Sequence, residues 1–174
     1  WENQVECLAA FLREAHKLSP VRHVFVNGMT ASAFTGLMKF EEQQALEANL
    51  ADRVRDLSGL KCNFENLFGL NLMQKVHRFL VCSFFVSPAG SAMVMPAGLG
   101  VPGVVVGYGE MLDFRRDMQP QIVARIPCGM SEKSDAKGIN EYQWASESEL
   151  TSYRLDEKAF LEFAIRHYAM SVKS

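Results

Sequence analysis

The sequence predicts an α/β fold: a Rossmann-like, mostly parallel sheet with helices on both faces, in three α/β/α layers. Two observations predict it. Short apolar runs typical of strands alternate along the chain with segments whose apolar residues recur at helical spacing. A long uncharged interval, residues 79–109, contains three prolines and six glycines, so it must form several short buried elements and not one membrane-spanning helix. Short connections between such elements favour parallel strands with right-handed crossovers.

The first third of the chain predicts two helices and two strands. Apolar residues at helical spacing predict a helix over residues 3–17, and after a proline break the apolar run 22–27 predicts a short strand. The segment EEQQALEANLADRVRDLS predicts the clearest helix, ending at Gly59, and LKCNF a second short strand. Four residues share one face of the second helix: Leu46, Leu50, Val54 and Leu57.

The middle of the chain predicts a helix over residues 65–79 followed by a strand over 80–87. The strand segment, LVCSFFVS, is continuously apolar without alternation, so we expect both of its faces to be buried. The helix is expected to turn a set of apolar residues inward: Leu67, Leu70, Val76 and either Leu72 or Met73.

A strand-turn-helix-strand unit is predicted next. A turn at residues 88–90 leads into a short helix at about 91–99 and, after the break GVPG, into an apolar strand at 104–107. Residues 121–127 predict a further strand, and residues 128–153 a polar, irregular loop.

The chain closes with an amphipathic helix in the segment LDEKAFLEFAIRHYAMS. Asp156 is the predicted N-cap, because a short acidic side chain there accepts hydrogen bonds from free backbone donors. Leu155 and Phe160 flank it at the spacing of a hydrophobic staple.

Composition limits the class of protein and its partners. At 174 residues, the whole chain is expected to form a single α/β domain. It has 48% hydrophobic residues, 22% charged residues and a net charge of −2, which disfavour nucleic acid and anionic lipid as partners. We expect no membrane span. The chain opens on Trp1 without a leader segment, so we expect a fragment or processed product of a larger protein.

The cysteines favour a reducing compartment, although four cysteines would also allow two disulfides in an oxidising one. They are widely scattered and show neither CxxC spacing nor a cluster with histidine, so no metal site is expected. We interpret them as reduced structural thiols and expect a cytoplasmic location. The four residues are Cys7, Cys62, Cys82 and Cys128.

The turn between the strand ending near residue 87 and the following helix is the main candidate for a ligand site. In a parallel sheet, ligands bind at the carboxyl ends of strands, where helix N-termini point free N–H groups outward. Gly90 lets a ligand approach the backbone, Ser91 offers a hydroxyl, and with Ala92 they begin a helix whose N–H groups suit a phosphate or diphosphate. The plain alternative is a tight structural turn.

Other polar residues are weaker candidates for the same site. Asn27, Gly28 and Thr30 follow the first strand and would lie at the same sheet end if the strands are parallel, although an ordinary loop is the alternative. Arg115 and Arg116 would neutralise a diphosphate, although adjacent arginines are commonly solvated surface.

The motifs KVHRF, SPAGSA and GLGVPGVVVG, in this order around an apolar strand, resemble the C-terminal, nucleotide-sugar-binding half of the GT-B glycosyltransferases. The resemblance covers roughly residues 60–110. It implies that the turn at Gly90 and Ser91 receives the donor's phosphates and that Gly100-Val101-Pro102 leads into the next strand. This chain has Met95 where many members carry a glutamate that holds the donor ribose, and its length leaves out the acceptor-binding N-terminal half.

The resemblance therefore predicts a donor-binding glycosyltransferase domain that takes a nucleotide sugar and needs no cofactor beyond magnesium carried by the diphosphate. Two alternatives remain open. One is a non-catalytic α/β domain for protein association, and the other is a hydrolase with Cys128 or Ser91 as nucleophile. Ser91 lacks the Gly-x-Ser-x-Gly pattern of a nucleophile elbow.

Overall fold

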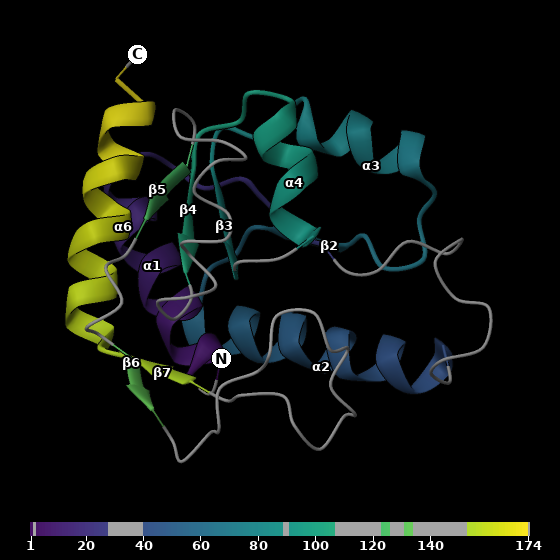
Figure 1. Ribbon diagram of the computed structural model, residues 1–174, viewed down its shortest axis with the longest axis horizontal. Helices are drawn as coiled ribbons and strands as arrows, with labels where there is room; N and C mark the ends of the chain where they lie inside the picture. The colour runs from purple at the N-terminus through teal and green to yellow at the C-terminus, as the bar shows by residue number, and fades with distance from the viewer. Residues whose placement is uncertain are drawn as a thin grey trace.

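The computed structural model has a mixed α/β fold (Figure 1). Its α/β class agrees with the sequence prediction. The structure describes these residues: 1, 3–27, 40–88, 91–106, 123–125, 131–133 and 153–173. The helices in this part are α1 (Gln4–Leu18), α2 (Phe40–Ser58), α3 (Leu72–Phe79), α4 (Ser91–Gly98) and α6 (Glu157–Ser171). The strands in it are β1 (His23–Val26), β2 (Asn63–Asn66), β3 (Phe85–Pro88), β4 (Gly103–Val106), β5 (Val123–Arg125), β6 (Ser131–Lys133) and β7 (Tyr153–Leu155).

The described strands pair in three groups. β1 and β2 are parallel, with His23 opposite Asn63. β3, β4 and β5 form a second parallel group, in which Phe85 lies opposite Gly103. β6 and β7 form an antiparallel pair. β6 lies within residues 128–153, which the sequence predicts to be an irregular loop, and the prediction was therefore wrong for β6. The parallel pairing predicted for the earlier strands is confirmed.

The hydrophobic core lies where α1 and α6 cover β4 (Figure 1). The buried β4 residues Val104 and Val106 belong to this cluster, together with Phe160 of α6. Val105, which points the other way along the strand, is also buried but lies outside the cluster. β4 is therefore covered on both faces, which explains its unbroken apolar sequence.

Asn3 connects the start of α1 to the end of β7. Its side chain is only 2% exposed. Its Nδ2 donates to the carbonyl oxygen of Leu155 at 2.9 Å, and its Oδ1 accepts from the Leu155 backbone N–H and the Trp1 indole N–H, each at 3.1 Å. This asparagine thus pairs both backbone groups of the last β7 residue and satisfies its own buried amide.

The final helix agrees with the sequence prediction. The Asp156 carboxylate accepts a hydrogen bond from the Ala159 backbone N–H at 2.7 Å, which makes it the N-cap of α6. Leu155 and Phe160 are both buried in the same cluster, as the predicted staple requires.

The region around α3 differs from the prediction. The helix begins at Leu72 and not at residue 65, because Asn71 forms a capping box in which its side chain and that of Gln74 each accept the other residue's backbone N–H. Leu72 and Met73 are exposed, Met73 by 62%, whereas Lys75 is buried. The predicted inward face was wrong for Leu72 and Met73.

The boundaries of two neighbouring elements also differ. β3 begins only at Phe85, and Leu80 and Val81 before it are exposed, so the prediction of a strand buried from residue 80 onward was wrong. In α2, Val54 is buried as predicted, but Leu57 is half-exposed near the C-terminus of the helix. That helix ends at Ser58, and Gly59 directly after it has a φ of +66°, a conformation that glycine adopts at little cost.

Candidate functional site

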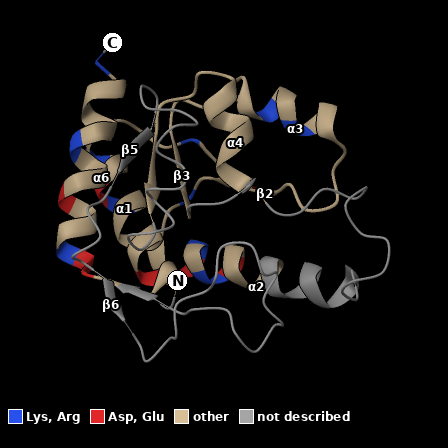
Figure 2. Cartoon of the chain, in the orientation of Figure 1, with Lys and Arg blue, Asp and Glu red and all other residues tan. Residues whose placement is uncertain are grey.

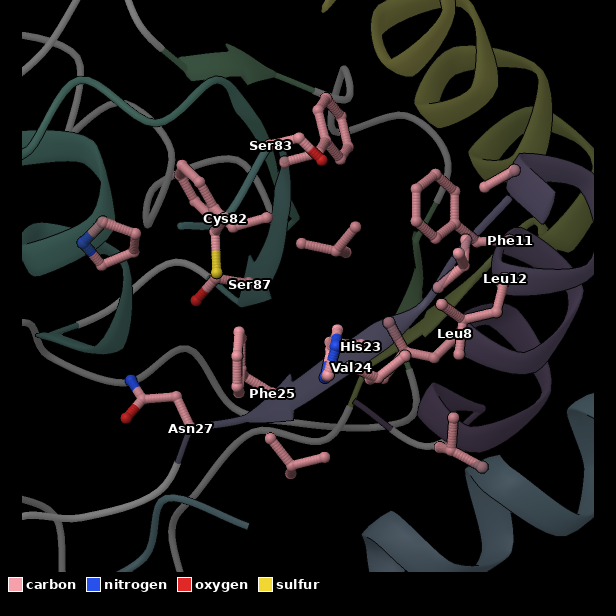
Figure 3. Close-up of a pocket in the computed structure, with 18 of the residues that line it drawn as sticks. Leu8, Phe11, Leu12, His23, Val24, Phe25, Asn27, Cys82, Ser83 and Ser87 are labelled. Atoms are coloured by element: carbon pink, nitrogen blue, oxygen red, sulfur yellow. The ribbon is translucent and has the colours of Figure 1, made fainter. Parts of the chain in front are cut away.

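A cavity with a volume of about 930 Å³ lies between β1 and β3 (Figure 3). All residues of β1 and of β3 line it. In the described part of the chain, β1 pairs only with β2, and β3 pairs only with β4, so the cavity separates the two parallel groups. Its volume lies in the range of pockets that hold small molecules.

One side of this pocket is apolar. Figure 3 shows Leu8, Phe11 and Leu12 of α1 on this side. Leu50 and Val54 of α2 also line the pocket, so two helices of the hydrophobic core supply its apolar wall. Such a wall suits an apolar or aromatic part of a ligand.

The carboxyl ends of β1 and β3 supply a more polar part. Asn27 directly follows β1, Ser87 and Pro88 end β3, and Ala92 lies in the first turn of α4; all four line the pocket. The Ser87 hydroxyl donates to the Pro88 carbonyl at 2.9 Å. The ends of two strands and the start of a helix therefore meet at one pocket, which is the arrangement expected for a ligand site in a parallel sheet.

The structure brings together two of the residues predicted for the site, Asn27 and Ala92. Ser91 begins α4, and its side chain is outside the described part of the structure. The other predicted site residues lie outside the described residues: Gly28, Thr30, Gly90, Arg115 and Arg116.

Lys75 is the residue that sequence reasoning missed. It is 1% exposed, and its Nζ donates to the Asn27 Oδ1 at 3.1 Å. It lies in α3, 48 residues after Asn27 in the chain. The available signal was its position four residues before Phe79, the other buried residue of that helix, because residues at this spacing share one face.

The charges near the pocket favour an anion more than a cation. Figure 2 shows basic residues and no acidic residue on α3. Glu65 of β2 lines the pocket, but its carboxylate accepts from Arg78 of α3, with Oε1 at 2.9 Å from both Nε and Nη2. Because the Glu65 carboxylate is paired with an arginine, it repels an anionic ligand less than an unpaired carboxylate would.

Cys82 lines the pocket but lacks the properties of a nucleophile. Burial raises the pKa of its thiol to about 11, and its Sγ donates to the Arg78 carbonyl at 3.3 Å. At neutral pH the thiol is therefore protonated, and the thiolate is the reactive form. Cys128, the candidate nucleophile of the hydrolase alternative, lies outside the described residues.

The described residues contain neither a metal-ligand cluster nor a membrane-spanning helix. No group of three or more His, Cys, Asp or Glu side chains that could hold a metal ion occurs among them. None of the helices described is both long and apolar enough to cross a bilayer.

Comparisons with models of protein families, with curated proteins and with solved structures found no match to this chain. The pocket geometry and the sequence motifs are therefore the basis for a functional proposal.

Proposed function

We propose that this chain is the nucleotide-sugar-binding domain of a GT-B-type glycosyltransferase, with the donor diphosphate held at the Gly90-Ser91 turn. The observation that carries the proposal is the meeting of Asn27, Pro88 and Ala92 at one pocket. Asn27 directly follows β1. Pro88 ends β3 and Ala92 lies in the first turn of α4, so these two residues flank the turn that the resemblance assigns to the phosphates.

The strand order supports this location. All residues of β1 and of β3 line the pocket, and we propose that these two strands are neighbours in one sheet with the order β2-β1-β3-β4-β5. In that order, the direction in which the chain adds strands reverses between β1 and β3. In open parallel sheets, the crevice outside the carboxyl ends of the strands at such a reversal is the usual ligand site. The finer architecture that we propose is a three-layer, Rossmann-like α/β/α domain, which the coverage of β4 on both faces supports.

The chemistry would be stabilisation of a leaving diphosphate. The first-turn N–H groups of α4 provide a partial positive charge for the phosphates, and the apolar wall of α1 and α2 is available to an uncharged part of the donor. The acceptor site and the base would come from a further domain, as the two-domain architecture of the resembled family implies. Magnesium would enter only with the diphosphate.

A thermal-shift titration of the chain against nucleoside monophosphates, nucleoside diphosphates and nucleotide sugars tests the proposal. A ligand at a hundredfold its Kd stabilises the folded state by about 2.7 kcal/mol, so binding gives a measurable rise in Tm. We expect a base-selective rise that Gly90→Val abolishes, because the added side chain blocks the approach to the turn. Gly98→Val, at the exposed other end of α4, is the matched control and should keep the rise.

Flat curves across the panel with folded protein would contradict the proposal and favour the association domain.

A specific observation favours that alternative: four large apolar side chains on or just after α3 are more than half exposed. They are Leu72, Met73, Leu80 and Val81. Clusters of exposed apolar side chains commonly mark protein interaction surfaces.

A further inference from the structure

The hydrogen bond between Lys75 and Asn27 fixes which atoms Asn27 offers to a ligand. An ammonium group can only donate, so the atom that it meets at 3.1 Å must be the amide oxygen. The Nδ2 group, with its two N–H donors, is then the remaining part of the amide. Among the described residues it has no hydrogen-bond partner, and Asn27 lines the pocket at the end of β1 (Figure 3).

Lys75 also changes the strength of these donors. A positive charge beside the amide oxygen draws electron density toward that oxygen, which makes the N–H groups at the other end better donors. Lys75 itself is buried in α3 and does not line the pocket, so it acts on the pocket through Asn27. A donor-only, polarised amide suits the oxygen atoms of an anion, and phosphate oxygens accept without donating.

We propose that Lys75 is a positioning residue that holds the Asn27 carboxamide with its N–H donors toward the pocket and thereby makes the β1 end of the pocket a site for a phosphate oxygen. The proposal deepens the proposed function and rests on it for the identity of the ligand, because it adds the Asn27 carboxamide to the proposed diphosphate site. It differs from the sequence-based expectation in giving Asn27 a defined donor role and in adding Lys75.

Calorimetric titration of the chain with inorganic pyrophosphate and with a nucleoside diphosphate tests this assignment. Asn27→Asp keeps an acceptor for the Lys75 ammonium, so the variant should fold. It replaces the N–H donors by a carboxylate oxygen, which has the same negative charge as the phosphate probes. We expect an affinity loss of at least about tenfold for both probes. Asn66→Asp is the matched control: Asn66 ends the neighbouring strand, accepts from the Phe68 N–H and does not line the pocket. It should keep most of the affinity.

A double-mutant cycle separates positioning from a general structural role. Lys75→Met should weaken pyrophosphate binding in the natural chain but add little to the loss in an Asn27→Ala background, because the lysine acts through that amide. A purely structural role of Lys75 would lower affinity equally in both backgrounds, which would overturn the proposal. It would also be overturned if Asn27→Asp bound pyrophosphate like the natural chain, or if the natural chain did not bind pyrophosphate at all.

The two proposals fail in different ways. If pyrophosphate binds and Asn27→Asp abolishes its binding, but nucleotide sugars bind no more tightly than pyrophosphate, the Lys75 assignment stands and the nucleotide-sugar function falls. If nucleotide sugars bind tightly and Asn27→Asp leaves both ligands unaffected, the function stands and the Lys75 assignment falls.

Discussion

Two asparagines show how differently the two sides of this molecule use the same side chain. Asn3, beside the α1 and α6 core, has its amide oxygen and nitrogen both bonded to Leu155, which ties β7 to the start of α1. Asn27, which lines the pocket, has its oxygen bonded to the buried Lys75, and its nitrogen has no hydrogen-bond partner among the described residues. A saturated amide holds a fold together, whereas a half-saturated amide at a pocket is available for a ligand.

The largest expected loss of stability comes from a substitution in the hydrophobic core beside α1 and α6. Phe160 is fully buried and meets the Trp1 ring edge-to-face at 5.5 Å. Phe160→Ala should lower the free energy of unfolding by about 3 to 5 kcal/mol, because it removes buried apolar surface and leaves a cavity. Urea unfolding measures the change, with Phe163→Ala on the partly exposed side of the same helix as the control. Equal losses in the two variants would contradict this account of the core.

The second prediction applies one substitution to both asparagines. Asn3→Asp should cost about 3 kcal/mol, because a carboxylate oxygen would replace the donor that now meets the Leu155 carbonyl at 2.9 Å in a buried site. Asn27→Asp should leave the free energy of unfolding unchanged or higher, since the new carboxylate faces the Lys75 ammonium. Chemical denaturation of both variants checks the contrast. Similar destabilisation at both positions would refute the comparison.

The third prediction concerns the strand pair between the core and the pocket. A Cβ at Gly103 would run into the ring of Phe85, its cross-strand partner, which also lines the pocket. Gly103→Ala should cost about 2 kcal/mol through overpacking and also disturb the pocket wall. Thermal unfolding of this variant beside Gly98→Ala, at the exposed end of α4, isolates the clash. A Gly103→Ala chain as stable as the control would show that Phe85 moves away freely.

The smallest effect concerns the pH dependence of stability through Cys82. Burial raises the pKa of its thiol to about 11 in the folded chain, above its ordinary value of 9.0. The thiol is neutral in both states below pH 9, and between pH 9 and 11 the unfolded chain loses this proton first. The neutral, buried Cys82 thiol therefore contributes less to the free energy of unfolding as the pH rises from 9 to 11. Unfolding midpoints should fall more steeply with pH for the natural chain than for Cys82→Ala, and identical slopes would contradict the assignment.

The sequence predicted those parts of the fold that depend on local patterns. Alternating strands and helices predicted parallel pairing, which β1 with β2 and β3 with β4 confirm. The Asp156 cap was predicted because capping depends on residues close in the chain. Strand direction predicted that Asn27 lies at the same sheet end as the turn before Ala92, and both residues line one pocket; their role in a ligand site stays a prediction.

The rest depended on contacts between distant segments. Leu72 and Met73 look like inward residues by type, but α3 buries the face that carries Lys75 and Phe79, and packing against distant segments decides which face is buried. The spacing of Lys75 to Phe79 indicates a shared helix face, but a lysine at that position does not predict burial, because its partner Asn27 lies 48 residues earlier. The short β6 strand pairs with the distant β7, and residues Ser131 to Lys133 have little strand propensity of their own.

The central claim is that a phosphate-bearing nucleotide binds where β1, β3 and α4 meet. The most direct measurement is an NMR titration of the isotope-labelled chain with a nucleoside diphosphate, which follows backbone amides and the Asn27 side-chain amide. The account predicts saturable shifts at Asn27, Ser87 and Ala92, with the Asn27 Nδ2 protons among the most affected, and no change at Phe160 and Ala164 of α6. Saturable shifts confined to other surfaces, or none at these residues, would contradict it.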